Sequence, residues 1–194
     1  GLVRRQRLPR RVALVAHYRG VADVGAYGEM HVEREGYAGL ADVGAGVTNV
    51  AVVAPAARLR RTGLAPDAFL DAWLAAHPHL GARFASAQRL GAVRATGPFA
   101  HRAARGWASG AALVGDAADF FDPFTGEGIY AALRGGEKIA PFAAAAVAGG
   151  PASDAALRAY DRARRSTFRG KWRVERLVGL AVAVPWLMTR AASA

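Results

Sequence analysis

The sequence contains no cysteine among its 194 residues. This absence excludes a disulfide framework, a cysteine nucleophile, a zinc site built on thiolates and an iron–sulfur cluster held by cysteines. It fits a reducing compartment, and we expect the protein to be cytoplasmic. Long apolar runs are also absent: the longest, Leu177 to Met188, contains Pro185 and is shorter than the ~20 residues that span a bilayer. The sequence therefore predicts no transmembrane helix.

Lysine is scarce, because only Lys138 and Lys171 contribute to the 26 basic residues. The net charge of +11 comes from two arginine-rich segments, residues 4–11 and 158–176, while the rest of the chain is balanced. Neither segment has the interleaved aromatic residues and glycines of a stacking surface, so we expect no nucleic-acid partner. The second segment precedes the apolar run. We expect the apolar run and the basic residues before it to form a C-terminal helix. This helix is interpreted either as a cover for an apolar surface of the protein or as a peripheral contact with an anionic membrane.

Short segments rich in valine, tyrosine and alternating residues occupy the first part of the chain. They cover residues 12–17, 28–33, 36–42 and 47–54, and glycine-containing turns separate them. This pattern predicts an antiparallel sheet. A helix is expected from Pro66, because proline suits the first helical turn and Phe69 and Trp73 lie on one helical face. A weaker strand is expected at 91–96.

The run from Ala111 to Gly115 is interpreted as a short buried strand. A loop follows it, and then a helix whose apolar and small residues recur at helical spacing. These residues are Ile129, Ala132, Leu133, Gly136, Ala140, Ala143, Ala144 and Val147. We expect this face to pack on a sheet. Further helices are expected from Ser153 and from Val174, and the elements together predict an α+β fold.

The residues that join this strand to this helix form the most informative part of the sequence. Residues 113–138 read LVGDAADFFDPFTGEGIYAALRGGEK. Asp116 follows the strand, Pro123 lies in the loop, and Gly126 and Gly128 open the helix. A helix N-terminus has unpaired N–H groups and a partial positive charge, and glycines there let a planar or anionic ligand approach the backbone. The segment therefore predicts a ligand site.

Two other interpretations of this segment are weaker. Asp116, Asp119 and Asp122 could bind a metal ion, but no further ligand accompanies them, and loop capping is the simpler explanation; we expect no metal. The string from Gly126 to Ala131 also matches the G-x-G-x-x-A form of a dinucleotide fingerprint. In that motif the glycines directly follow the strand, whereas here the strand is expected to end at Gly115. We therefore do not interpret the string as a pyrophosphate site.

The segment resembles the second flavin motif of the FAD-dependent monooxygenase and oxidoreductase superfamily, which includes para-hydroxybenzoate hydroxylase and the geranylgeranyl reductases. Gly115 and Asp116 match the family's Gly-Asp pair, whose acid binds the ribityl chain. Pro123 matches a proline near the isoalloxazine ring. The matching helix start is Gly126-Glu127-Gly128, whose amides in the family point at the pyrimidine edge of the flavin. The resemblance implies that these residues bind FAD.

The resemblance also implies a domain arrangement. Residues 1–100 would form an antiparallel substrate domain with one helical segment, 101–150 the strand, loop and helix of an FAD-binding α/β domain, and 151–194 the C-terminal helices. The family's first flavin motif, G-x-G-x-x-G after an N-terminal strand, is absent from the sequence. We therefore expect the C-terminal portion of a longer protein, completed by an N-terminal dinucleotide-binding segment and reduced by NAD(P)H, and we expect this chain to be inactive alone.

In this superfamily the substrate lies between the flavin and the antiparallel sheet. Sheet residues with polar or aromatic tips are therefore the candidates for substrate binding, namely His17, Tyr18, Glu29, His31 and Tyr37. Such residues are more often structural, and no pattern identifies a catalytic acid or base. The resemblance implies a monooxygenase acting on a small organic substrate. The alternatives are a geranylgeranyl reductase-like enzyme that reduces isoprenoid chains, or a non-catalytic basic fragment.

Overall fold

The computed structural model describes residues 3–5, 10–149 and 153–182. It divides into two compact units, which we describe separately. The sheet unit contains residues 10–98 and 181–182, and the helix unit contains residues 3–5, 99–149 and 153–180. Within the described residues, no helix is both long enough and apolar enough to cross a membrane.

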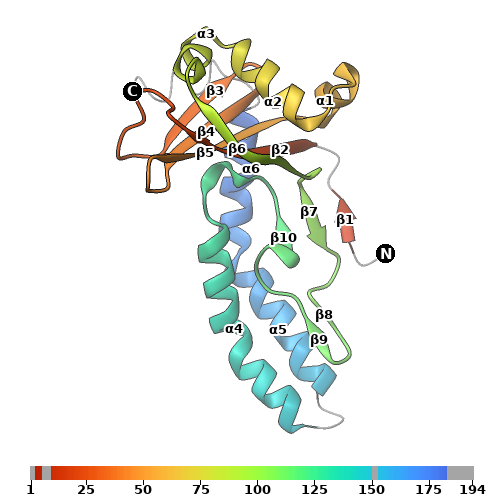
Figure 1. Ribbon diagram of the computed structural model, residues 1–194. Helices are drawn as coiled ribbons and strands as arrows, with labels where there is room; N and C mark the ends of the chain where they lie inside the picture. The colour runs from red at the N-terminus through yellow and green to blue at the C-terminus, as the bar shows by residue number, and fades with distance from the viewer. Residues whose placement is uncertain (1–2, 6–9, 150–152, 183–194) are drawn as a thin grey trace, which may run out of the picture. The chain divides into compact units, whose positions relative to one another are not determined.

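The sheet unit is built on a five-stranded antiparallel sheet (Figure 1). Its strands are β2 (Arg11–Arg19), β3 (Glu29–Glu33), β4 (Gly36–Asp42), β5 (Val47–Pro55) and β6 (Gln88–Thr96), in the spatial order β3-β4-β5-β2-β6. Strands β3, β4 and β5 form a meander, and β2 pairs with β5 on one side and with β6 on the other. The antiparallel sheet and the α+β class predicted from the sequence are confirmed.

Three helices cover one face of this sheet (Figure 1): α1 (Ala56–Thr62), α2 (Pro66–Ala75) and α3 (Pro78–Gly81), followed by the short turn η1 (Ala82–Phe84). Helix α2 begins at Pro66, as expected, and buries Leu70 and Trp73 against the sheet. Because side chains alternate along a strand, Leu14 and Tyr18 of β2 enter this core. Ala16, between them, also lies in the core, whereas Val15 and His17 point to the opposite face, which we call the open face because α1, α2 and α3 do not cover it.

The helix unit contains short strands and three long helices. Strands β1 (Val3–Arg5), β7 (His101–Ala103) and β10 (Asp119–Phe120) form one antiparallel sheet, and β8 (Trp107–Ala108) and β9 (Ala111–Ala112) form a hairpin. The turns η2 (Gly115–Ala117) and η3 (Pro123–Thr125) lead into α4 (Gly128–Ala148), α5 (Ser153–Thr167) and α6 (Arg169–Val182). The last helix begins earlier than the expected Val174. Helix α4 packs along α5 and against η2.

Two expectations for this unit were wrong. The strand expected at 111–115 is limited to Ala111–Ala112, and Leu113 and Val114 are only half-buried. The expected inner face of α4 is exposed: Ile129 is 78%, Leu133 71% and Val147 89% accessible.

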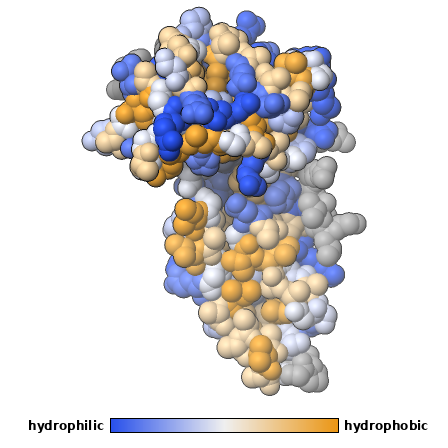
Figure 2. Space-filling model, viewed as in Figure 1, coloured by the Kyte–Doolittle hydropathy of each residue, from blue (hydrophilic) through white to orange (hydrophobic). Residues whose placement is uncertain are grey.

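The smaller residues of α4 face inward instead. Ala131 and Gly135 are the buried residues of this helix. A side chain at Gly135 would come within 2.7 Å of Val114 Cγ1, so only glycine permits such close packing. The apolar stripe therefore lies on the solvent side, and Figure 2 shows apolar side chains along this part of the surface.

Candidate functional site

Gly115 places the loop directly against α4. Its φ of +57° lies in the left-handed region, and a Cβ at this position would lie 3.1 Å from Ala132 Cβ and 3.2 Å from Ala132 Cα. A larger residue would therefore be strained in its backbone and would crowd the helix. The Gly of the Gly-Asp pair is thus explained by local conformation and packing.

Asp116 lies beside the start of α4, although twelve positions separate it from Gly128 in the sequence. A Cβ added to Gly128 would be 3.5 Å from Asp116 Oδ1 and 3.7 Å from Oδ2. The partial positive charge of the helix N-terminus favours a carboxylate at this place. The backbone of Asp116 is held in addition by His101, whose Nε2 donates to the Asp116 carbonyl oxygen at 2.9 Å.

The N-terminus of α4 is open toward ligands. Glu127 precedes the helix without making a capping hydrogen bond through its side chain, and the first turn contains no acidic residue. Gly126 has φ +68°, and within the described part of the chain a Cβ there would meet no atom within 4 Å. The backbone N–H groups at the helix start can therefore be approached by a flat or anionic group.

The loop is stiffened by a short turn between Asp116 and α4. Pro123 begins η3, and Asp122 caps it, because Asp122 Oδ1 accepts a hydrogen bond from Phe124 N at 3.1 Å. This buried carboxylate is thus part of the loop structure. Among the residues described, no group of three or more histidine and acidic side chains is placed to hold a metal ion.

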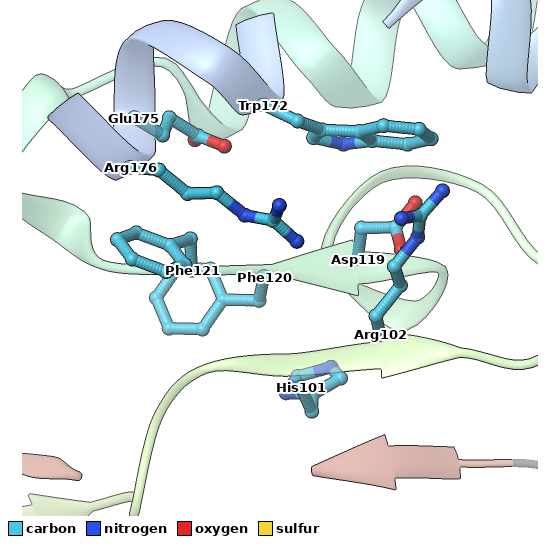
Figure 3. Close-up of a pocket in the computed structure, with 8 residues that line it drawn as sticks. All are labelled: His101, Arg102, Asp119, Phe120, Phe121, Trp172, Glu175 and Arg176. Atoms are coloured by element: carbon cyan, nitrogen blue, oxygen red, sulfur yellow. The ribbon is translucent and has the colours of Figure 1, made fainter. Parts of the chain in front are cut away.

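Asp119 is held inside the helix unit, and only 12% of its side chain is exposed. Its carboxylate pairs with Arg164 of α5, and its Oδ1 lies 3.4 Å from Arg102 Nε. Burial is the largest influence on this carboxyl group and raises its pKa, while the arginines oppose the shift. Figure 3 shows Asp119 and Arg102 side by side under the ring of Trp172, whose centroid lies 4.0 Å from the Arg102 guanidinium.

The pocket at this place is too small for a substrate. Its volume is about 20 Å³, and it is lined by His101, Arg102, Asp119, Phe120, Phe121, Trp172, Glu175 and Arg176 (Figure 3). A space of this size holds about one water molecule. Burial raises the pKa of Glu175, which is paired with Lys171. The cluster therefore brings side chains of β7, β10 and α6 together.

Three of the predicted substrate residues lie on the helix-covered side of the sheet unit. Tyr18 is buried in the core, and its ring packs edge-on against Phe84 at 5.1 Å. Glu29 forms two hydrogen bonds with Arg83, at 2.6 and 2.9 Å, and a third with His31 at 2.9 Å. The Arg83 guanidinium lowers the pKa of Glu29 to about 2. These contacts give all three residues structural partners.

His17 and Tyr37 belong to the open face. His17 is exposed and pairs across the sheet with Asn49 of β5 and Leu90 of β6. Tyr37 pairs with Val53 on the same face and is buried. The strand pattern alone could not find Asn49 as a neighbour of His17, because register depends on how β2 and β5 pair. Nor could it find His101 or Arg164, which contact the loop from distant elements.

Sequence comparison with curated proteins finds two related reductases. The digeranylgeranylglycerophospholipid reductase of Methanospirillum hungatei is 44% identical over 59 residues, which cover 30% of this chain and 15% of that protein. The same enzyme of Methanosphaerula palustris is 45% identical over 62 residues, covering 32% and 16%. The aligned segments thus span well under two thirds of these relatives. No known family profile matches the chain.

Solved flavoproteins share the fold over most of the chain. The myxobacterial FAD-dependent halogenase CndH has a TM-score of 0.72 at 20% identity, with 85% of this chain and 40% of that chain covered. The flavin-dependent brominase Bmp2 has a TM-score of 0.70 at 23% identity, covering 94% and 49%. A geranylgeranyl bacteriochlorophyll reductase-like protein from Thermoplasma acidophilum has a TM-score of 0.69 at 21% identity, covering 90% and 43%. Fold and sequence similarity together confirm the chain's resemblance to the FAD-dependent monooxygenase and oxidoreductase superfamily.

Proposed function

We propose that the chain is part of an FAD-dependent oxidoreductase that holds its flavin at the start of α4. The observation that carries this proposal is the Asp116 carboxylate lying beside Gly128 at an open helix N-terminus. Bound FAD would supply the redox chemistry that no side chain provides. The curated reductases and the solved flavoproteins support the assignment.

Each residue of the site fits a role toward the flavin. Asp116 would accept hydrogen bonds from hydroxyl groups of the ribityl chain. Gly126 and Gly128 would let a ring approach the backbone, whose N–H groups favour negative charge on it. Pro123 would limit the motion of the loop, and Glu127 would contribute through its backbone. NAD(P)H is the proposed reductant.

The proposed reaction is the reduction of an isoprenoid chain. The specific support is the 44% identity, over 59 residues, to a digeranylgeranylglycerophospholipid reductase. Monooxygenation of a small organic substrate is the second candidate, because it belongs to the superfamily that the chain resembles. In both cases the exposed His17 is the proposed substrate-binding residue of the sheet unit.

A dinucleotide-binding segment outside this chain is the proposed partner of the helix unit. The solved flavoproteins named above are longer than the aligned region, since the chain covers 40 to 49% of each. The exposed stripe of Ile129, Leu133 and Val147 offers such a segment an apolar surface.

The cofactor assignment is tested by FAD titration, followed by the visible spectrum and flavin fluorescence. The titration uses the 194-residue chain and the proposed longer protein. Asp116→Ala should weaken FAD binding by ~10-fold or more, since a charge-assisted hydrogen bond is lost. The matched control is Asp67→Ala, which removes an exposed carboxylate on α2 and should leave the affinity for FAD unchanged. Absence of FAD binding in both proteins would contradict the cofactor assignment.

Substrate class is tested separately on a protein that binds FAD. NAD(P)H consumption that depends on an added polyprenyl lipid supports the reductase. Consumption that depends on a small aromatic substrate, with oxygen uptake, supports the monooxygenase instead.

A further inference from the structure

Arg164 of α5 is a buried charge beside the loop that leads from β9 to α4. Its side chain is only 2% exposed. It pairs with Asp119 and, through NH2, with Asp161 Oδ1 at 3.0 Å. Removing a guanidinium from water costs several kcal/mol, which only well-placed partners offset. Such a group is therefore held in a defined place by its contacts.

Arg164 has one partner in the loop, Asp119, and one on its own helix, Asp161. Asp119 lies in β10, directly after η2, which contains Gly115 and Asp116. Asp161 accepts a hydrogen bond from Gly106 N at 3.0 Å, in the segment that precedes the β8–β9 hairpin. One ion-pair network thus joins α5 to both sides of the loop.

A second contact from α5 holds the backbone immediately before the loop. Tyr160, which is fully buried, donates its hydroxyl hydrogen to the carbonyl oxygen of Leu113 at 2.8 Å. Gly115, Asp119 and Arg164 also border one cavity of about 20 Å³, which leaves little room for the loop to shift. The loop is therefore fixed at Leu113 and at Asp119, with Gly115 and Asp116 between these two points.

We propose that Arg164 is a positioning residue for the cofactor, acting through Asp119. The Arg164 guanidinium binds both Asp119 and Asp161. These contacts fix the position of the loop and thereby the position of the Asp116 carboxylate relative to the N-terminus of α4. Arg164 makes no contact with the cofactor in this mechanism. The inference rests on the proposed function, because it assigns Arg164 a role toward the flavin held there.

The first test needs no cofactor. Hydrogen exchange of peptides covering residues 113–128 is compared in wild type, Arg164→Met and Arg162→Met. Arg162 is exposed on the same helix and is the matched control. Exchange in the loop should rise at least ~10-fold in Arg164→Met and remain unchanged in Arg162→Met. Equal loop protection in all three proteins would overturn the proposal, whether or not the chain binds FAD.

The second test measures FAD affinity, the visible spectrum of bound flavin and its midpoint potential. Arg164→Met should weaken binding by ~10-fold and shift the spectrum and the potential, because small displacements of a remote support are transmitted to the site. Arg164→Lys should restore binding only in part, since an ammonium lacks the planar fork. An unchanged spectrum, potential and affinity in Arg164→Met would contradict the role.

Asp119→Asn keeps the test decisive if Arg164→Met does not fold. This variant retains the shape of the side chain and leaves Arg164 paired with Asp161. It should increase loop exchange and, where wild type binds FAD, weaken binding in the same direction as Arg164→Met. Loop protection equal to wild type in Asp119→Asn would overturn the proposal. Absence of FAD binding by the wild-type chain and by the longer protein would count against the proposed function alone.

Discussion

Gly126 and Glu127 are adjacent, yet the structure assigns them different sensitivities to substitution. Gly126 has φ +68° and faces space where a ligand can lie, whereas Glu127 makes no side-chain cap. Gly126→Leu should therefore weaken FAD binding by ~10-fold or more, through backbone strain and lost access. Glu127→Gln should change affinity less than ~2-fold, because the residue acts through its backbone. FAD titration of both variants measures this, and full binding by Gly126→Leu would be the contrary result.

Glu29 makes the stability of the sheet unit depend on pH. Its pKa falls from 4.5 in a free side chain to about 2, chiefly because Arg83 donates hydrogen bonds to it. The stabilisation is present above pH 4.5 and is lost as the pH falls toward 2.

Glu29→Gln should accordingly lower the melting temperature at pH 7, by roughly 2–4 °C for each kcal/mol lost. The difference between wild type and variant should shrink at pH 3. Glu35→Gln removes a more exposed ion pair with Arg58 and should have a smaller effect. A Glu29→Gln difference that stays constant from pH 7 to pH 3 would disagree with this account.

Helix α4 shows how an element can be predicted while its orientation is missed. Its periodicity identified the helix, but the apolar residues lie outside and Ala131 and Gly135 lie inside. Periodicity says which residues share a face, and it does not say which neighbour that face meets. The same limit applies to residues 111–115, where the apolar run predicts a strand although only Ala111–Ala112 pair.

The exposed stripe of α4 should make the chain associate. Contiguous apolar surface on a single helix favours self-association when no partner covers it. Leu133→Lys should therefore lower the apparent mass at high concentration, measured by light scattering after size-exclusion chromatography. Lys138→Ala changes a partly buried position outside the stripe and serves as the control. A monomeric wild-type chain at all concentrations would show that the stripe does not drive association.

At the scale of the whole molecule, the basic residues of the C-terminal segment are shared between α5 and α6. Arg169, Arg173 and Arg176 are exposed beside Val174 and Leu177, which are 53% and 67% accessible. This combination suits an anionic membrane surface, which we propose as a peripheral contact. The apolar run that follows extends to residues outside those described.

Vesicle sedimentation tests this proposal. The chain should bind phosphatidylglycerol vesicles more tightly than phosphatidylcholine vesicles. Arg169→Glu combined with Arg173→Glu should reduce that binding ~10-fold or more, at about 1 kcal/mol for each cation near the surface. The control, Arg60→Glu combined with Arg61→Glu, changes two cations of α1 and should have a smaller effect. Equal binding to both vesicle types would contradict the proposed contact with an anionic membrane.

The sequence by itself determined the α+β class and the antiparallel sheet, and it indicated the resemblance to a flavin motif, because turn chemistry, alternation and the spacing of Gly115, Asp116, Gly126 and Gly128 are local properties. Only the tertiary structure decided that the Asp116 carboxylate meets the start of α4 and that Arg164 supports the loop from α5. It also decided that His17 and Tyr37 share the open face, while Tyr18, Glu29 and His31 do not. The reason is physical: register and helix packing depend on contacts between residues distant in sequence, and no local pattern records those contacts.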